Sequence, residues 1–138
     1  YMKTSYYANL KNIKYPVSIA GKCPDYYKGP EYKSLAPKYA WLKIWKEGPD
    51  HKGDNAWYIE QYNKTILEKT SPIKVLAGLS IKYPNIRLDE ITLLCWEDPE
   101  KFCHRHLVAD WLNKWYNSCS DTEKKLCEKI GFSGIEEA

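Results

Sequence analysis

Two apolar stretches and a short segment at the start of the chain predict β-strands. The clearest is 91–96 (ITLLCW), an apolar run without polar alternation, which is typical of a strand covered on both faces. Residues 16–20 (PVSIA) have the same character, and 2–8 (MKTSYYA) predict a shorter strand. The segment 21–34 is rich in glycine, proline and tyrosine, and we expect it to form a loop.

Apolar positions at helical spacing predict five helices. Start signals precede three of them: Asp54 or Asn55 as an N-cap, then Ser71-Pro72 and Asp98-Pro99 as cap and first-turn pairs. The predicted helices cover about 38–47, 56–69, 72–82, 99–115 and 121–130, and the tail 133–138 is expected to be frayed.

Strands separated by helices indicate an α/β fold with a mostly parallel sheet. We therefore expect one small three-layer domain over residues 1–138, with a sheet flanked by helices and a C-terminal helical extension from about 118 to 138. In such sheets ligands bind beyond the carboxyl ends of the strands. That rule brings together three segments: 6–8, 20–28 and 96–106.

Composition narrows the class of protein. The 138 residues are 43% hydrophobic and 28% charged, which is globular composition. No apolar run approaches the roughly 20 residues that span a bilayer, and the start lacks the apolar region of a signal peptide. The five cysteines form no CxxC pair, which favours reduced thiols. We expect a cytoplasmic protein that has no membrane contact.

The charge pattern argues against a protein that binds duplex nucleic acid. A net charge of +3 is too small for the basic stripe of such a domain. Only two of the 21 basic residues are arginine, Arg87 and Arg105. This scarcity indicates that the planar guanidinium is needed where it occurs, and it directs attention to Arg105. Aromatic residues are abundant, at 14%. They serve either as half-buried core rings or as surfaces that stack on flat ligands such as nucleobases.

A zinc site could be imagined from Cys95, Cys103, His104 and His106. However, Cys103 and His104 are adjacent, and adjacent side chains on a helix project about 100° apart, which suits shared coordination poorly. The sequence therefore predicts neither a metal nor a cofactor.

The stretch LLCWEDPEKFCHRHLVADWL, residues 93–112, resembles the signature of a domain-of-unknown-function family numbered four hundred and eighty-eight. This family occurs in bacteria, archaea and phages. The resemblance continues upstream and covers about residues 2–115, in the segments 4–8, 17–20, 24–29, 35–37 and 58–62. It implies an α/β domain and supplies no settled activity.

The Cys-His-Arg-His run at 103–106 carries the most chemistry. If the fourth helix begins near Phe102, its free N–H groups meet an anion there, and Arg105 adds bidentate contacts to a phosphate. If it begins at Pro99, the run lies one turn further along. Each residue also has a structural interpretation: a core histidine for His104, a buried thiol for Cys103 and Cys95, an anchor for Arg105, and a His106–Asp110 pair.

These features favour a protein that binds a phosphorylated nucleotide or nucleotide-derived molecule without catalysis, for example a phage protein that sequesters a host defence signal. No GxGxxG, P-loop, HExxH or GxSxG motif is present, and no carboxylate pair marks an acid and a base. The expected ligand-binding residues are Ser5, Tyr6, Tyr7, Lys22, Tyr26, Tyr27, Lys28, Trp96, Cys103, His104, Arg105 and His106.

Two other function classes stay open. The first is an enzyme that acts on a nucleotide or a nucleic-acid base, with Cys103 or His104 taking part. The second is a protein-interaction module that uses the aromatic residues of 21–45. A homodimer through the tryptophan-rich helices is also open, because five tryptophans at 41, 45, 57, 111 and 115 are many large rings for one small core.

Overall fold

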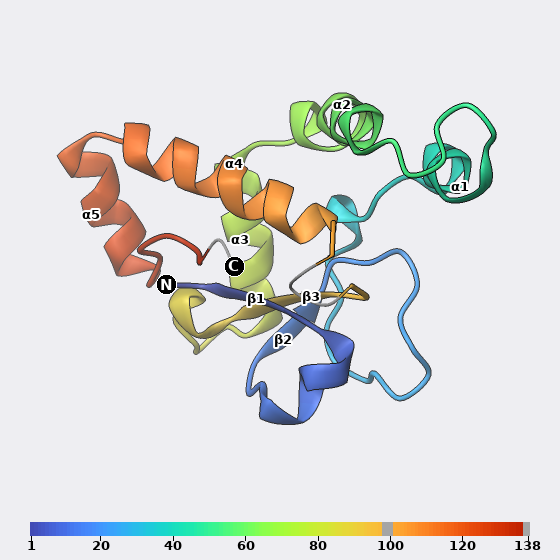
Figure 1. Ribbon diagram of the computed structural model, residues 1–138. Coiled ribbons are helices and arrows are strands. Elements are labelled where there is room, and N and C mark those ends of the chain that lie inside the picture. Colours follow the sequence, from blue (N-terminus) through green and yellow to red (C-terminus); the bar gives the residue numbers. More distant parts are fainter. Residues whose placement is uncertain (98–100, 137–138) are drawn as a thin grey trace.

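The fold is built on a three-stranded parallel sheet (Figure 1). In this computed structural model residues 1–97 and 101–136 are described. The strands are β1 (Lys3–Tyr6), β2 (Pro16–Ser18) and β3 (Thr92–Cys95), in the order β1-β3-β2. The central strand β3 is buried along its whole length, as its apolar run predicts. The predicted α/β class and parallel sheet are confirmed.

Alternation along β3 divides the core in two. Leu93 belongs to the main hydrophobic cluster beneath the helices, whereas Leu94 points to the opposite face. There it packs with Tyr7, Ala20 and Tyr27 in a smaller cluster. That face is therefore covered by the 3-10 helix that follows β1 and by the loop after β2, while the long helices gather on the other face.

In the described part of the chain, five α-helices follow the order that the apolar spacing predicts. Asp54 accepts a hydrogen bond from the backbone N–H of Trp57, and Ser71 accepts one from Lys74, so two predicted caps are confirmed. A full capping box at Ser120 starts the last helix. The helices are α1 (Tyr39–Glu47), α2 (Asn55–Thr65), α3 (Pro72–Lys82), α4 (His104–Ser118) and α5 (Asp121–Lys129).

Two helix boundaries differ from the prediction. Helix α2 ends at Thr65 and is followed by a separate 3-10 turn over Leu67–Lys69. Helix α4 begins at His104, because the backbone of Cys103 is extended and serves as its N-cap. The Asp98-Pro99 cap that the sequence predicts lies outside the described residues, but 101–103 are not helical.

The tail is packed, so the prediction of fraying is wrong for its described part. Phe132 and Ile135 are buried in the main cluster, and Ile135 forms a parallel bridge with Met2 beside β1. The Asn113 side chain bonds both the N–H and the carbonyl of Ile135, at 3.0 and 2.6 Å. Residues near the two ends of the sequence, Met2 and Ile135, thus lie side by side next to the sheet.

No helix among the described residues is both long enough and apolar enough to cross a bilayer.

Candidate functional site

A pocket of about 490 Å³ opens at the carboxyl ends of β2 and β3. Ala20 to Lys22 follow β2 and Cys95 to Glu97 end β3, so two of the three predicted strand ends contribute to it. The first turn of α4 closes one side, and helices α1 and α2 supply the opposite wall. The lining residues are Ala20, Gly21, Lys22, Pro37, Tyr39, Leu42, Lys43, Trp45, Lys46, Tyr58, Cys95, Trp96, Glu97, Phe102, Cys103 and His104.

Helix α1 contributes side chains that sequence reasoning missed. Tyr39, Leu42, Lys43 and Lys46 all line the pocket, and their spacing of three, four and seven residues places them on one face of the helix. This spacing was the available signal. However, it identifies only a shared face, and it does not say that the face meets a cavity rather than solvent.

Trp96 connects the two strand ends. Its indole Nε1–H donates a 2.7 Å hydrogen bond to the carbonyl of Lys22, which joins the end of β3 to the segment after β2. The Tyr7 ring packs edge-on against the indole, with the ring centroids 5.0 Å apart. These two contacts hold the ring in place. Trp96 remains 53% exposed, so its ring is still available to a ligand.

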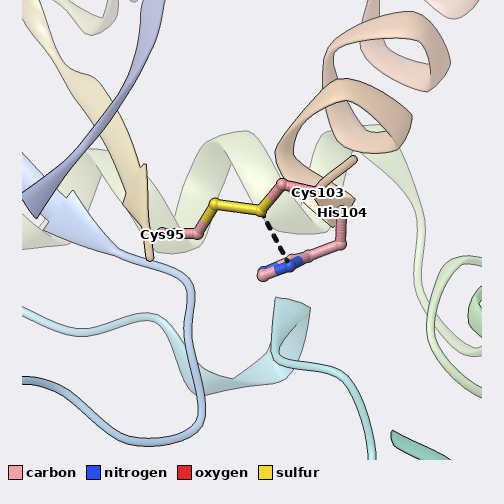
Figure 2. A group of neighbouring side chains, drawn as sticks. All are labelled: Cys95, Cys103 and His104. Atoms are coloured by element: carbon pink, nitrogen blue, oxygen red, sulfur yellow. Dashed lines mark hydrogen bonds between the residues drawn. A yellow bond between two sulfur atoms is a disulfide. The ribbon is translucent and has the colours of Figure 1, made fainter. Parts of the chain in front are cut away.

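Cys95 and Cys103 form a disulfide at the floor of the pocket (Figure 2). Cys95 is the last residue of β3 and Cys103 is the N-cap of α4, eight positions further along the sequence. The prediction of reduced thiols is therefore wrong for this pair, and Cys95 is not a simple core residue. Among the described residues, Cys23, Cys119 and Cys127 are free thiols.

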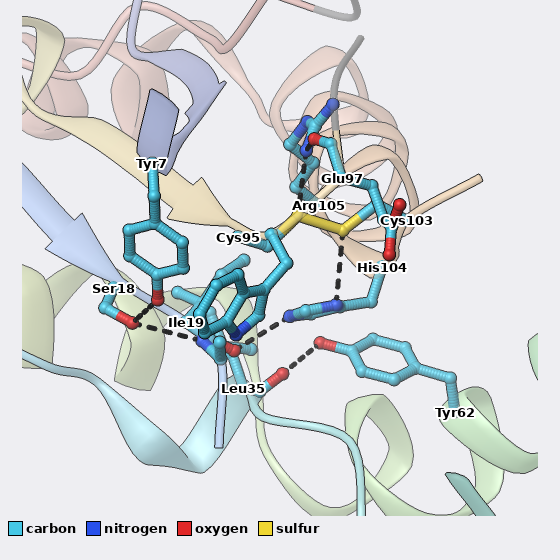
Figure 3. The surroundings of a disulfide bond; sticks show 12 residues. Tyr7, Ser18, Ile19, Leu35, Tyr62, Cys95, Glu97, Cys103, His104 and Arg105 are labelled. Atoms are coloured by element: carbon cyan, nitrogen blue, oxygen red, sulfur yellow. Dashed lines mark hydrogen bonds between the residues drawn. A yellow bond between two sulfur atoms is a disulfide. The ribbon is translucent and has the colours of Figure 1, made fainter. Parts of the chain in front are cut away.

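His104 lies beside the disulfide with its tautomer set by the fold (Figure 3). Its Nε2 is 2.8 Å from the carbonyl oxygen of Ile19, which can only accept, so Nε2 carries the hydrogen. The lone pair of Nδ1 then faces Cys103 Sγ, at 3.5 Å. Burial lowers the pKa of His104 to about 4, so the ring is neutral near pH 7.

Arg105 has the anchoring role rather than the predicted contact with phosphate. Its side chain is 1% exposed and does not line the pocket. The guanidinium Nη1 donates to Cys95 Sγ at 2.8 Å and to the carbonyl of Glu97 (Figure 3). These contacts fix the segment that follows β3 and, with it, the position of Trp96.

Four of the twelve predicted binding residues line the pocket: Lys22, Trp96, Cys103 and His104. The other eight lie elsewhere in the described structure. Tyr7 supports the pocket from behind, since its ring touches Trp96 and its hydroxyl bonds Ser18 Oγ at 2.5 Å. The hydroxyl of Tyr27 donates to the Pro30 carbonyl at 2.6 Å, so Tyr27 closes the loop on itself.

The remaining five have other surroundings. Ser5 and Tyr6 lie in β1, where Ser5 Oγ accepts from Asn9, and Tyr26 and Lys28 are exposed on the loop. His106 is half-buried on α4. Burial, with the charge of Arg105 as the next cause, lowers the His106 pKa. The expected partner Asp110 instead pairs with Lys114 at 2.9 Å, one helical turn further along.

Cys103 is not helical, so the prediction that Cys103 and His104 project about 100° apart on a helix is wrong. Since Cys103 is an extended N-cap, its side chain and that of His104 are not constrained to helical directions. The donor atoms of Cys95, Cys103 and His104 lie within 4.8 Å of one another. His106, the fourth residue of the imagined set, is not part of this group.

Comparisons with known proteins place the chain in a family. Residues 14–116, well over half of the chain, match a family model described as the active DUF488-N3 subclade. No curated protein and no solved structure matches the chain. The match includes both strands that end at the pocket and the whole Cys-His-Arg-His run. The chain is therefore a member of the DUF488 family.

Proposed function

We propose that this protein binds a phosphorylated nucleotide or a nucleotide-derived small molecule in the pocket at the ends of β2 and β3. One observation carries the proposal: the same pocket is lined by large aromatic rings and by three lysines, Lys22, Lys43 and Lys46. Flat rings suit a base, and ammonium groups suit phosphate.

The size and lining of the pocket support a ligand of this class. A volume of about 490 Å³ lies within the range of small-molecule sites, which are mostly apolar with a few polar groups. Stacking on an aromatic ring contributes roughly 1–3 kcal/mol per base. The candidate rings are Tyr39, Trp45, Tyr58, Trp96 and Phe102.

The charge of the lining favours an anion. Among the lining residues that the structure describes, three are lysines and one, Glu97, is a carboxylate, and the neighbouring His104 is neutral because burial lowers its pKa to about 4. The N-terminus of α4 also lies at the pocket, where Cys103 and His104 are lining residues. The positive dipole end of this helix would add to the attraction.

A ligand-retention assay tests the proposal. The protein would be incubated with a panel of linear and cyclic nucleotides and ADP-ribose derivatives, washed and denatured, and the released molecules identified by mass spectrometry. A nucleotide released intact supports binding, and with it sequestration of a signal molecule. If no member of the panel is retained, the nucleotide proposal is wrong and a protein partner becomes the better candidate.

Neutralising the α1 lysines should weaken binding of the retained nucleotide. The double variant Lys43→Gln/Lys46→Gln removes two charges from the pocket wall, and we expect at least about a tenfold rise in Kd by calorimetry. The matched control Lys125→Gln/Lys129→Gln makes the same charge change on exposed positions of α5. Equal affinity of the two variants would show that the ligand binds elsewhere.

A second candidate function is an enzyme that acts on such a nucleotide. The favouring observation is that Cys103 and His104 lie together on the pocket floor, with the Nδ1 lone pair directed at the sulfur. A reduced Cys103 would thus have a neighbouring base. Recovery of an altered nucleotide from the same assay supports this function over binding alone.

A further inference from the structure

Two sulfurs and one imidazole nitrogen converge on the pocket floor. Cys95 and Cys103 come from the end of β3 and the N-cap of α4, and His104 from the first position of α4 (Figure 2). All three side chains are buried, and all three residues line the pocket. We propose that the reduced protein binds one Zn²⁺ ion through these three residues, with a fourth position facing the pocket. This inference does not rest on nucleotide binding.

The donor set matches the chemistry of zinc. Cysteine thiolates and a histidine nitrogen are typical zinc ligands, and three protein ligands with one open position are characteristic of catalytic rather than structural zinc sites. Soft sulfur ligands disfavour Mg²⁺ and Ca²⁺, which prefer oxygen. The open position would hold water or a polar group of a pocket ligand.

His104 already has the orientation of a metal-bound histidine. Its Nε2–H is directed at the Ile19 carbonyl at 2.8 Å, which leaves the lone pair of Nδ1 pointing at the sulfurs (Figure 3). A hydrogen bond from the second ring nitrogen to a carbonyl or carboxylate is the usual support of a ligating histidine. The fold thus fixes the required tautomer without any metal.

The spacing of the cysteines also suits a shared ion. Their Cα atoms are 7.4 Å apart, more than the roughly 4.4–6.8 Å that most disulfides span. At tetrahedral geometry and Zn–S bonds of about 2.3 Å, two thiolates lie about 3.8 Å apart, which needs a wider pair of Cα positions than a disulfide does. Arg105 donates to Cys95 Sγ at 2.8 Å, so a positive charge lies beside this sulfur.

Zinc binding and the disulfide exclude each other, because both use the same two sulfurs. A phosphine reductant breaks the S–S bond: water supplies the oxygen of the phosphine oxide and the two hydrogens of the thiols. Zn²⁺ then displaces the two thiol protons as it binds. The oxidised protein, with both sulfurs in the S–S bond, lacks the site.

Zinc uptake by the reduced and the oxidised full chain tests the proposal. The phosphine would be removed under argon, Zn²⁺ added, and affinity measured by competition with a chromophoric chelator. We expect one ion per reduced chain and at least a roughly 100-fold weaker affinity in the oxidised chain, in Cys95→Ser and in Cys103→Ser. Cys119→Ser, which changes a half-buried thiol on a different surface, should bind as the wild type does.

An alkylation experiment on the wild type covers the case in which a buried cysteine variant does not fold. Reduced protein with and without Zn²⁺ would be treated with iodoacetamide, and each cysteine quantified by peptide mass spectrometry. Zinc should slow alkylation of Cys95 and Cys103 and leave Cys23 and Cys119 unchanged. No stoichiometric zinc uptake by the reduced protein, or protection of Cys23, Cys119 or Cys127 instead, would overturn the proposal.

Discussion

At the scale of single residues, side chains that look alike in sequence have opposite roles in the structure. Lys22 and Lys43 line the pocket, whereas Arg105 is buried and holds the end of β3 through Cys95 and Glu97. Guanidinium Nη1 makes both of these contacts, to Cys95 Sγ and to the carbonyl of Glu97. The scarcity of arginine in the sequence indicated a special role, but the neighbours that define the role are tertiary.

The buried His104 makes folding stability depend on pH. Because burial lowers its pKa from 6.5 to about 4, the unfolded chain takes up a proton as pH falls through 6.5 while the folded chain does not. The contribution of His104 to the free energy of unfolding is therefore at its full value above about pH 6.5. It decreases as the pH falls from 6.5 to 4, by about 3 kcal/mol in total.

Urea unfolding of the wild type and of His104→Gln at several pH values checks this. The glutamine amide can still donate to the Ile19 carbonyl but does not titrate, so the difference in free energy of unfolding between the two proteins should change across that window. Parallel curves for the wild type and His104→Gln would contradict the assigned burial.

At the scale of secondary-structure elements, the ends of helices are decided by backbone contacts as much as by caps. Helix α5 ends at Lys129, and Gly131 follows its C-cap with a φ of +80°, a conformation that favours glycine. A Cβ built at this position would lie 2.5 Å from Arg87 Cβ and 2.8 Å from its Cα. Gly53 has a similar φ of +71° but open space around it.

The two glycines form a matched pair of substitutions. Gly53→Ala should cost about 1 kcal/mol, from the backbone conformation alone. Gly131→Ala should cost at least about 1 kcal/mol more, because Arg87 and the turn before β3 would have to move. Urea unfolding of both variants measures the two losses in free energy of unfolding. Equal losses would mean that the turn around Arg87 can move without a loss of stability.

At the scale of the whole molecule, the last described residues complete the core. The side chain of Ile135 is 3% exposed and packs in the main cluster, 133 positions from its bridge partner Met2 along the sequence. Ile135→Ala should therefore lower the free energy of unfolding by about 2–4 kcal/mol.

The control for this prediction is Ile81→Ala. Ile81 lies on α3 with 73% of its side chain exposed, and its truncation should cost less than about 0.5 kcal/mol beyond the change in helix propensity. Thermal and urea unfolding of both variants measure the two losses in free energy of unfolding. A similar loss in the two proteins would show that the tail contributes nothing to the core.

Local patterns in the sequence determined most of the elements. The apolar runs and the short segment at the start of the chain predicted all three strands, and the cap residues Asp54 and Ser71 fixed the starts of α2 and α3, because these signals act between neighbours in the chain. The parallel sheet followed from the alternation of strands and helices, and the strand-end rule located two sides of the pocket. The signature at 93–112 predicted the family.

Only the tertiary structure decided which of these surfaces meet. The spacing of Tyr39, Leu42 and Lys43 defines a helix face, but its position over the strand ends depends on how α1 packs against distant segments. The convergence of Cys95 with Cys103 depends on the start of α4, which an extended N-cap shifted to His104. Local chemistry selects a conformation for each segment, whereas the contacts between segments follow from burying all apolar faces at once.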